Sequence, residues 1–329
     1  MAMKQPKLKN DTVVEVEELV VTFTVRGESG SQTIIPVDHV NFSIRKGEVL
    51  ALVGESGSGK STIGRALVRI NRPSGGTIRV NGEDVTNISG RKLKDYRKNA
   101  QMVFQDPFGS LNPVKTIENH LTFPLKKHQG YRGQELYQKV GELLHKVGLT
   151  PVNEIRVKYP YELSGGQRQR LAIARALAVN PMFVVADEPI SMLDVSIRAG
   201  ILELMNQLKA DFGLSYLYIT HDLASARYFG DRIMVMYGGK VMEVADSKEL
   251  IKEPLHPYTR LLLASTPGSQ MDIDLTNYSN EPPNLNIERK GCTFAYRCPL
   301  ATDICREQMP SLLDKGLSSD HLVACHHSN

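Results

Sequence analysis

A glycine-rich octapeptide, GESGSGKS at Gly54–Ser61, stands between an apolar run, VLALV, and a helical pattern, STIGRALV. The octapeptide fits G-x-x-x-x-G-K-[ST], and a strand before it and a helix after it are the setting that this pattern requires. Glycines allow backbone N–H groups to surround phosphate oxygens, and the N-terminus of the following helix adds partial positive charge. The sequence therefore predicts a nucleotide-phosphate site in an α/β fold; a solvent turn rich in Gly and Ser is the alternative.

The residues of this loop have distinct expected tasks in binding ATP and Mg²⁺. Lys60 is expected to reach the β- and γ-phosphates, and Ser61 to ligate Mg²⁺. The candidate phosphate-binding residues are Gly54, Glu55, Ser56, Gly57, Ser58, Gly59, Lys60, Ser61 and Thr62.

A second apolar run, FVVAD at residues 183–187, ends in an acidic pair, Asp187 and Glu188. Buried strand ends normally avoid adjacent carboxylates, because burying charge without a partner is costly. Beside a phosphate loop, Asp187 is expected to bind Mg²⁺, and Glu188 is the candidate general base for an attacking water. Two acids that merely cap a strand are the alternative.

Strand patterns alternate with helical patterns along most of the chain, which predicts right-handed βαβ units and a mostly parallel sheet. A polar, helix-rich block between about 91 and 161 indicates a helical insertion. Hairpins are expected around Asn81–Gly82 and over 231–245. The Pro-, Asn- and Ser-rich residues 268–286 indicate a linker. Further expected strands lie at 13–25, 49–53, 183–187 and 214–221, and expected helices at 168–180 and 198–213.

The sequence Leu163-Ser164-Gly165-Gly166-Gln167 begins a predicted helix, so it forms a second potential anion site. One nucleotide needs only one phosphate-binding loop, so a second anion site in the same chain predicts a second nucleotide. LSGGQ at this place is the signature of ABC transporter ATPases, and the chain resembles that family over about residues 13–270. The resemblance implies a head-to-tail pair of ATPase subunits in which Ser164, Gly165, Gly166 and Gln167 close the partner's phosphate loop.

The resemblance also implies roles for single residues, with Gln105, Glu188 and His221 as the catalytic set. Gln105, which follows the expected strand AQMVF, fits the position that touches Mg²⁺ and the water, and His221 the one that contacts the γ-phosphate. Ser191–Asp194 fits the D-loop, with Met192 where the family more often has Ala. Phe23 fits the aromatic that stacks on adenine, although a strand Phe is more often a core residue.

The family implies a RecA-like P-loop NTPase core with an antiparallel β subdomain and a helical ABC subdomain at about 91–169. On this basis residues 1–255 are the expected ATPase domain, and residues 256–329 a small cysteine-containing C-terminal extension. The stretches QDPFGSLNP, EPLHPYTRLLLASTP and GCTFAYRCP resemble the dipeptide, oligopeptide and nickel importers of the family. The same role in oligosaccharide or nickel uptake, or a soluble non-transport ABC ATPase, is the alternative.

The chain has a formal net charge of +4 without any Lys/Arg tract, so no nucleic-acid partner is expected. It also has neither a signal-peptide pattern nor a run of about 18 apolar residues long enough to span a bilayer. The resemblance then implies separate partners: a second ABC ATPase subunit, two transmembrane permease subunits and an extracytoplasmic solute-binding protein. The expected location is the cytoplasmic face of the cell membrane.

All four cysteines fall in the last 38 residues, at Cys292, Cys298, Cys305 and Cys325. Their spacing is neither that of a paired zinc ribbon nor that of a bacterial ferredoxin. Four soft thiolates in a cytosolic chain still suit iron–sulfur or zinc, and similar tails in the peptide-importer subfamily resemble [4Fe–4S] sites. The cluster is the favoured cofactor; zinc, a disulfide or no ligand are alternatives. His321, His326 and His327 are candidate zinc ligands, but a polar tail is their favoured interpretation.

Overall fold

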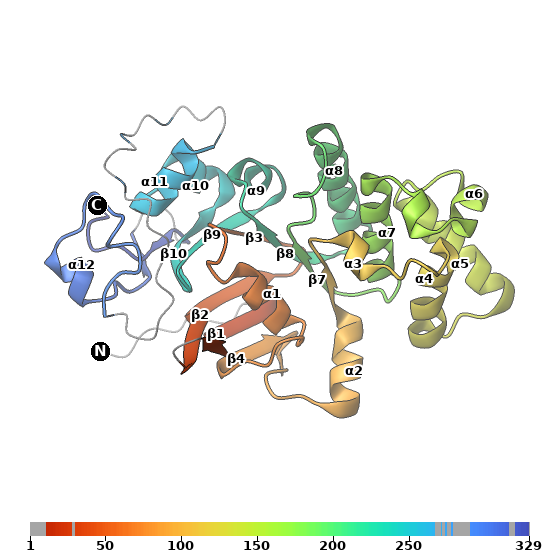
Figure 1. Cartoon of the computed structure of the whole chain (residues 1–329), viewed down its shortest axis with the longest axis horizontal. Coiled ribbons are helices and arrows are strands. Elements are labelled where there is room, and N and C mark those ends of the chain that lie inside the picture. Colours follow the sequence, from red (N-terminus) through yellow and green to blue (C-terminus); the bar gives the residue numbers. More distant parts are fainter. Residues whose placement is uncertain are drawn as a thin grey trace.

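The computed structural model describes residues 11–27, 30–266, 271, 274, 278, 290–315 and 320–328, which form two sheets with helices around them (Figure 1). The predicted linker, 268–286, lies almost wholly outside these residues. The larger sheet has eight strands in the order β11-β12-β10-β9-β3-β8-β7-β6, and the smaller has four in the order β2-β1-β4-β5. No helix in the described part of the chain is both long enough and apolar enough to cross a membrane.

The larger sheet has a parallel centre and an antiparallel edge. Every residue of β3, β7 and β8 is buried, as expected for parallel strands covered on both faces. The predicted βαβ arrangement and the buried strand at 49–53 are confirmed. The strands are β3 (Val49–Val53), β6 (Ala100–Val103), β7 (Phe183–Asp187), β8 (Ser215–Thr220), β9 (Arg232–Tyr237) and β10 (Lys240–Asp246), followed by β11 (Leu313–Asp314) and β12 (Leu322–Val323).

The smaller sheet is antiparallel and covers helix α1 (Lys60–Leu67) from the side opposite the larger sheet (Figure 1). Apolar side chains of both sheets and of α1 form one core cluster, which fixes the helix that follows the glycine loop. The predicted Asn81–Gly82 turn is confirmed, with both residues at positive φ. The strands are β1 (Thr12–Gly27), β2 (Gly30–Arg45), β4 (Gly75–Val80) and β5 (Glu83–Asp84).

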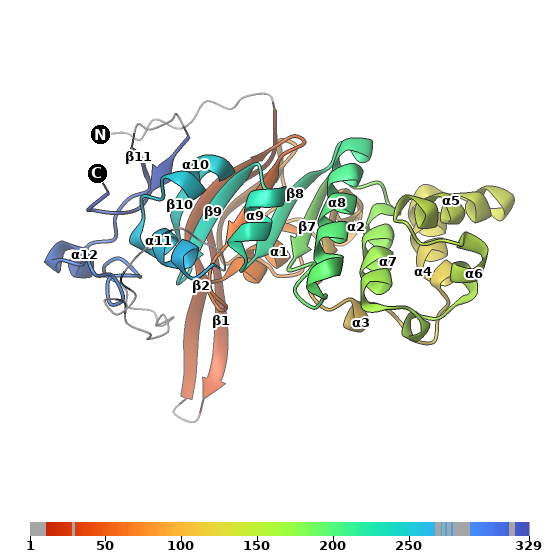
Figure 2. The same cartoon turned by 90° about the horizontal axis from the view of Figure 1, so that it is seen from above.

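A helical subdomain projects from the β6–β7 side of the larger sheet, at the opposite end of the molecule from α12 (Figure 2). Strand β6 falls on the run AQMVF, where a strand is expected, and belongs to the larger sheet, so it interrupts the helix-rich block between 91 and 161. Helix α2 (Gly90–Asn99) lies apart from this subdomain and packs through Tyr96 against the core (Figure 1). The helices of the subdomain are α3 (Pro107–Ser110), α4 (Ile117–Pro124), a π-helix (Leu125–Gln129), α5 (Gly133–Lys146), α6 (Val152–Val157), a 3-10 turn (Pro160–Glu162) and α7 (Gly165–Leu177).

The C-terminal extension packs onto the ATPase core. Strands β11 and β12 lengthen the larger sheet beyond β10, and the fully buried Phe294 belongs to the main core cluster. The predicted limit between 255 and 256 stays a prediction. The remaining helices are α8 (Val195–Phe212), α9 (Leu223–Phe229), α10 (Ser247–Lys252), α11 (Pro257–Ala264) and α12 (Asp303–Glu307).

Candidate active site

The glycine loop joins the end of β3 to the start of α1 and is held by close backbone contacts. A Cβ atom on Gly54 would lie 2.1 Å from the Met236 carbonyl oxygen, and one on Gly59 only 1.9 Å from that of Pro36. Gly59 also has a φ of 102°, in the region that favours glycine. These two positions therefore require glycine for packing as well as for any approach of phosphate.

Lys60 is buried inside this loop. Its Nζ donates hydrogen bonds to the carbonyl oxygens of Gly54 at 2.7 Å and Glu55 at 2.8 Å. Burial lowers the pKa of Lys60, and the carboxylates of Glu188, Asp187 and Glu55 partly offset that effect. A desolvated ammonium group gains strongly from a nearby anion, so the buried Lys60 is compatible with the predicted phosphate site.

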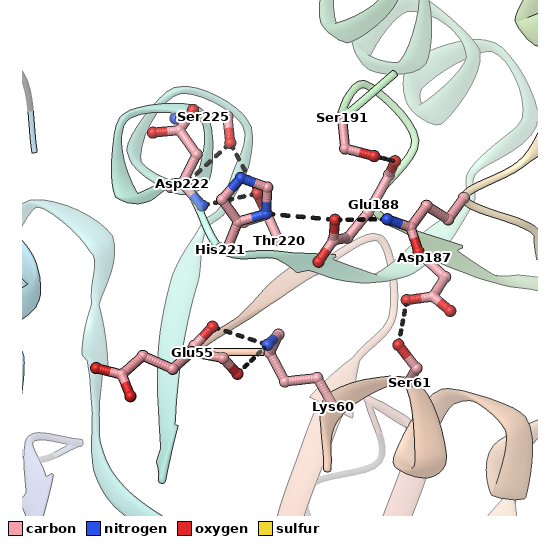
Figure 3. A network of polar contacts seen from close by, with 12 residues as sticks. Glu55, Lys60, Ser61, Asp187, Glu188, Ser191, Thr220, His221, Asp222 and Ser225 are labelled. Atoms are coloured by element: carbon pink, nitrogen blue, oxygen red, sulfur yellow. Dashed lines mark hydrogen bonds and ion pairs between the residues drawn. The ribbon is translucent and has the colours of Figure 1, made fainter. Parts of the chain in front are cut away.

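Ser61 and Asp187 come together from two elements, α1 and the end of β7 (Figure 3). The Ser61 hydroxyl donates to Asp187 Oδ1 at 2.8 Å. Burial raises the pKa of Asp187 although the Ser61 hydrogen bond and the nearby Arg65 and Lys60 lower it. A hydroxyl and a carboxylate are the hard oxygen donors that Mg²⁺ prefers, so the pair fits that cation.

Glu188 lies between the two other predicted catalytic residues (Figure 3). Its Oε2 accepts a hydrogen bond from Gln105 Nε2 at 3.1 Å and lies 3.3 Å from His221 Nδ1. The three residues follow β6, β7 and β8, whose carboxyl ends meet at one edge of the parallel sheet. The fold therefore assembles at one place three residues that are far apart in sequence.

The backbone of Glu188 is in the left-handed region, with a φ of 46°. Such a conformation is costly for a residue other than glycine and is kept only where its surroundings enforce it. Here the amide donates to the Ile219 carbonyl at 2.9 Å, and the carbonyl accepts from the amide of Ser191 at 3.2 Å and its hydroxyl at 3.0 Å. These bonds turn the carboxylate toward Gln105 and His221.

The LSGGQ segment lies apart from this group, at the start of α7. The Ser164 hydroxyl accepts from the Gln167 amide at 3.2 Å, and Gln167 Oε1 accepts from the Ser164 amide at 3.0 Å. This reciprocal capping box begins a helix of 13 residues whose first turn is partly exposed. Within this first turn, Gly166 lies so close to Ile197 of α8 that it leaves no room for a side chain.

Asp194 and Phe23 occupy exposed positions outside the Glu188 group. Asp194 begins α8 without a side-chain cap, and the adjacent Met192 and Val195 are 58% and 78% exposed. Phe23 is 39% exposed on β1, where it pairs with Ile34 of β2, two residues before the Pro36 that contacts the glycine loop. The binding roles predicted for both residues stay predictions.

A phosphate loop, an acidic strand end and an assembled Gln-Glu-His set define a P-loop ATPase. The signature helix has the order and spacing of one class of such enzymes, the ATP-binding cassettes. The expected fold class and ATPase activity are both confirmed by the comparisons that follow.

The chain belongs to the ABC transporter family. The family model described as ABC transporter matches residues 37–191, and the one described as oligopeptide/dipeptide transporter, C-terminal region, matches residues 242–305. The oligopeptide transport ATP-binding protein AppF of Bacillus subtilis is 45% identical over 96% of this chain and 97% of its own length. The di/tripeptide transport ATP-binding protein DppF of Pseudomonas aeruginosa is 40% identical over 97% and 98%.

Solved cassettes share the fold. The dimeric cassette MJ0796, in a post-hydrolysis state bound to ADP and Pi, has a TM-score of 0.62 and 30% identity over 71% of this chain and 98% of its own. The cbiO1 protein of Clostridium perfringens has a TM-score of 0.64 and 27% identity over 74% and 92%.

The four cysteines line one small pocket, away from the Glu188 group, together with Phe294 and His326. All four are free thiols, so the disulfide alternative is not formed. Burial, together with the neighbouring thiols, raises the pKa of Cys292 to about 12 and that of Cys298 to about 11. Within the described ranges no three His, Cys, Asp or Glu side chains are arranged to hold a single metal ion. Four thiols are the kind of donor that soft metal centres use, so the residues that line the pocket are compatible with such a centre.

The favoured interpretation of His321 as part of a polar tail is wrong. The side chain is fully buried and lies 2.8 Å from both Glu243 Oε1 and Glu249 Oε1. The sequence offered no local signal for this, because both glutamates lie more than 70 positions away. His326 and His327 contact Gln308 and Thr302 instead.

Sequence reasoning also missed Arg297 and Tyr258, which contact Glu55 of the glycine loop. Tyr258 is fully buried, and both residues lie more than 200 positions from the loop. A basic residue beside Cys298 and a tyrosine in an amphipathic helix look like ordinary surface and core residues.

Proposed function

We propose that this chain is the ATP-hydrolysing subunit of a peptide importer and drives separate permease subunits in the membrane. The carboxylate of Glu188, held between Gln105 and His221 beside the Ser61–Asp187 pair, is the observation on which this proposal depends. Relatives that match almost the whole chain are named as oligopeptide and di/tripeptide transport proteins, which supports peptides as the solute.

The residues divide the work of hydrolysis between them. Lys60 and the loop amides bind the β- and γ-phosphates, while Ser61, Asp187 and Gln105 are the ligands for Mg²⁺, which neutralises negative charge on the phosphates when bound. Glu188 orients the attacking water and accepts its proton. His221 holds Glu188 from the other side and faces the place of the γ-phosphate.

The exposed LSGGQ helix completes the site of a second cassette. Ser164 and Gly165 begin α7 and are not fully buried, so this helix N-terminus is open to an anion, and Asp194 begins α8, whose Ile197 packs against Gly166. Two cassettes arranged head to tail would enclose two nucleotides. ATP then favours the closed pair because it binds both subunits only in that state, which is how a ligand changes a conformational equilibrium.

The variant Glu188→Gln tests the assignment. It keeps the shape and the hydrogen bond to Gln105 but removes the base, so turnover falls by about 100-fold or more while ATP binding is kept. The exposed Glu203 of α8 offers a matched control, since Glu203→Gln leaves both quantities as in the unchanged protein. Normal ATPase rates in Glu188→Gln, measured with the partner subunits, would sink the assignment of Glu188.

Uptake measurements test the solute. Cells that lack this subunit are expected to lose import of labelled di- and oligopeptides and to recover it with the intact chain. Loss of oligosaccharide or nickel uptake instead would move the chain to another branch of the importers.

The proposed partners are a second ABC ATPase subunit, two permease subunits and an extracytoplasmic solute-binding protein, and the proposed location is the cytoplasmic face of the membrane. The dimeric form of the related cassette MJ0796 supports the pairing of cassettes. Capture of the tagged chain from detergent-solubilised membranes is expected to recover permease subunits. Recovery of ribosomes or DNA without permeases would contradict this assignment.

The proposed cofactor of the cysteine pocket is a structural [4Fe–4S] cluster bound by Cys292, Cys298, Cys305 and Cys325. All four thiols line one pocket and are free, and four cysteine thiolates are the ligands that such a cluster uses, which supports this choice over a disulfide. Coordination deprotonates thiols, so a bound metal would leave no protonated thiol buried in the pocket.

Anaerobic purification with iron, sulfide and zinc analysis tests the cofactor. About four irons and four sulfides per chain, with a broad visible absorbance lost in Cys298→Ser, are expected. Colourless protein with one zinc per chain would overturn the proposal.

A further inference from the structure

The cysteine segment touches the glycine loop directly. Arg297, between Cys292 and Cys298, forms an ion pair with Glu55, with 2.7 Å between Nη1 and Oε2. The Arg297 side chain is 11% exposed and that of Glu55 33%, so water screens this pair less than a surface pair. Residues separated by 242 positions thus meet at the second residue of the phosphate loop.

Glu55 is held from three sides. Its amide donates to the hydroxyl of Tyr258 at 2.8 Å, its carbonyl accepts from Lys60 Nζ at 2.8 Å, and its carboxylate accepts from Arg297. The Lys60 contact belongs to the phosphate loop itself. The other two come from the C-terminal part of the chain, from α11 and from the turn that follows Cys292.

Arg297 itself is fixed by an aromatic cluster. Its amide donates to the Phe294 carbonyl at 3.0 Å, and its guanidinium lies 5.8 Å from the Phe294 ring centre and 5.6 Å from that of Tyr237. Phe294 packs edge-on against Tyr237 at 5.2 Å and lies tilted against Tyr258 at the same distance. The arginine is therefore held in place before any nucleotide arrives, and little side-chain entropy remains to be lost.

The charge of Glu55 makes this contact relevant to nucleotide binding. A carboxylate at the entrance of a phosphate site repels the phosphates of ATP, and in a partly buried place this repulsion is strong. The guanidinium cancels that charge and at the same time keeps the carboxylate turned away from the loop interior, where Lys60 lies.

We propose that Arg297 is a positioning residue for the nucleotide site: it neutralises Glu55 and holds the start of the phosphate loop, so that the C-terminal cysteine segment sets the affinity for ATP. This inference rests on the proposed function, in which the loop binds ATP. Arg297 does not touch the reacting atoms, and its loss affects binding more than the chemical step.

The test is a double-mutant cycle in the purified full-length chain, with the dissociation constant of ATP measured by calorimetry and KM and kcat from steady-state hydrolysis. Arg297→Gln is expected to weaken ATP binding about tenfold and to raise KM similarly, with kcat changed less than about twofold. In the Glu55→Gln background the same substitution is expected to change the dissociation constant less than about twofold, because no carboxylate remains to be neutralised.

Two further variants separate this role from mere stabilisation. Arg297→Lys keeps the positive charge, so ATP binding within about threefold of the unchanged chain is expected. Arg45→Gln removes another ion pair between the core and the C-terminal segment, with the exposed Asp320, and is expected to leave ATP binding unchanged. Wild-type affinity in Arg297→Gln, or a loss of affinity that is the same with and without the Glu55→Gln substitution, would overturn the inference. Absence of ATP binding by the unchanged chain would instead contradict the proposed function.

Discussion

His321, which directly precedes β12, links that strand to the ATPase core by ion pairs with Glu243 and Glu249. Its Nε2 lies 2.8 Å from Glu243 Oε1 on β10, and its Nδ1 lies 2.8 Å from Glu249 Oε1 on α10. Both nitrogens can donate to carboxylates only if both carry protons, so the geometry requires the imidazolium form. Burial lowers the pKa of His321, but the hydrogen bonds to Glu243 and Glu249 outweigh it, and the pKa is raised.

The loss of unfolding free energy expected when His321 is replaced follows from the burial of its partner Glu243. Glu243 is fully buried, and its carboxylate also accepts hydrogen bonds from the backbone amides of Leu255 and His256. His321→Gln keeps one donor and loses one charge-assisted hydrogen bond, which lowers the free energy of unfolding by about 2 kcal/mol. His321→Ala removes the charge and also both donors, so that the buried carboxylate of Glu243 keeps no hydrogen bond from this position, and the loss rises to about 4 kcal/mol.

Urea unfolding followed by circular dichroism at a series of pH values measures these losses. Because the folded-state pKa of His321 is raised, its stabilisation is complete below the unfolded pKa of about 6.5 and disappears as pH rises through the folded-state pKa. The difference between the unchanged chain and His321→Gln is therefore largest near pH 6 and shrinks in alkaline solution. A difference that stays constant over this range would refute the argument that the charge of His321 holds the segment.

Two further substitutions test the packing of the same regions. Phe294→Ala is expected to lower the free energy of unfolding by about 3 to 5 kcal/mol, because the ring is fully buried in the main core. Tyr296→Ala, at a side chain that is 77% exposed, is expected to change the free energy of unfolding by less than about 0.5 kcal/mol. Equal effects of the two substitutions would show that the C-terminal segment is not part of the core. Gly57→Ala is expected to cost about 1 to 2 kcal/mol through its positive φ alone, since nothing lies within 4 Å of the added Cβ. Gly59→Ala is expected to cost clearly more in the same urea measurement, because its Cβ would lie 1.9 Å from the Pro36 carbonyl, and an equal cost for the two variants would contradict this geometry.

The elements that the sequence predicted best are those specified by a short local pattern. The apolar runs VLALV and FVVAD are the buried parallel strands β3 and β7, with the same limits as predicted. The Asn81–Gly82 pair forms its hairpin because both residues tolerate positive φ. Gln105, Glu188 and His221 were placed together from a family pattern, and parallel strand ends bring them within hydrogen-bond reach.

The contacts that escaped prediction join segments far apart in sequence. A histidine between Asp320 and Leu322 gives no sign that Glu243 and Glu249 will enclose it. The left-handed φ of Glu188 is equally invisible, because glutamate has no local preference for it and only the bonds to Ile219 and Ser191 impose it.

The C-terminal segment is joined to the ATPase core at several places: among them, β12 pairs with β10, Phe294 enters the main core, Arg297 pairs with Glu55, and His321 pairs with Glu243. A segment held so firmly cannot change shape around its four cysteines without moving at least one of these contacts, and Arg297 is separated from Cys298 by a single peptide bond. If filling the cysteine pocket alters the affinity for ATP by some factor, linkage requires ATP to alter the affinity of the pocket for its own ligand by the same factor. The effect of the pocket's ligand on the affinity for ATP and the effect of ATP on the affinity for that ligand then measure the same coupling free energy.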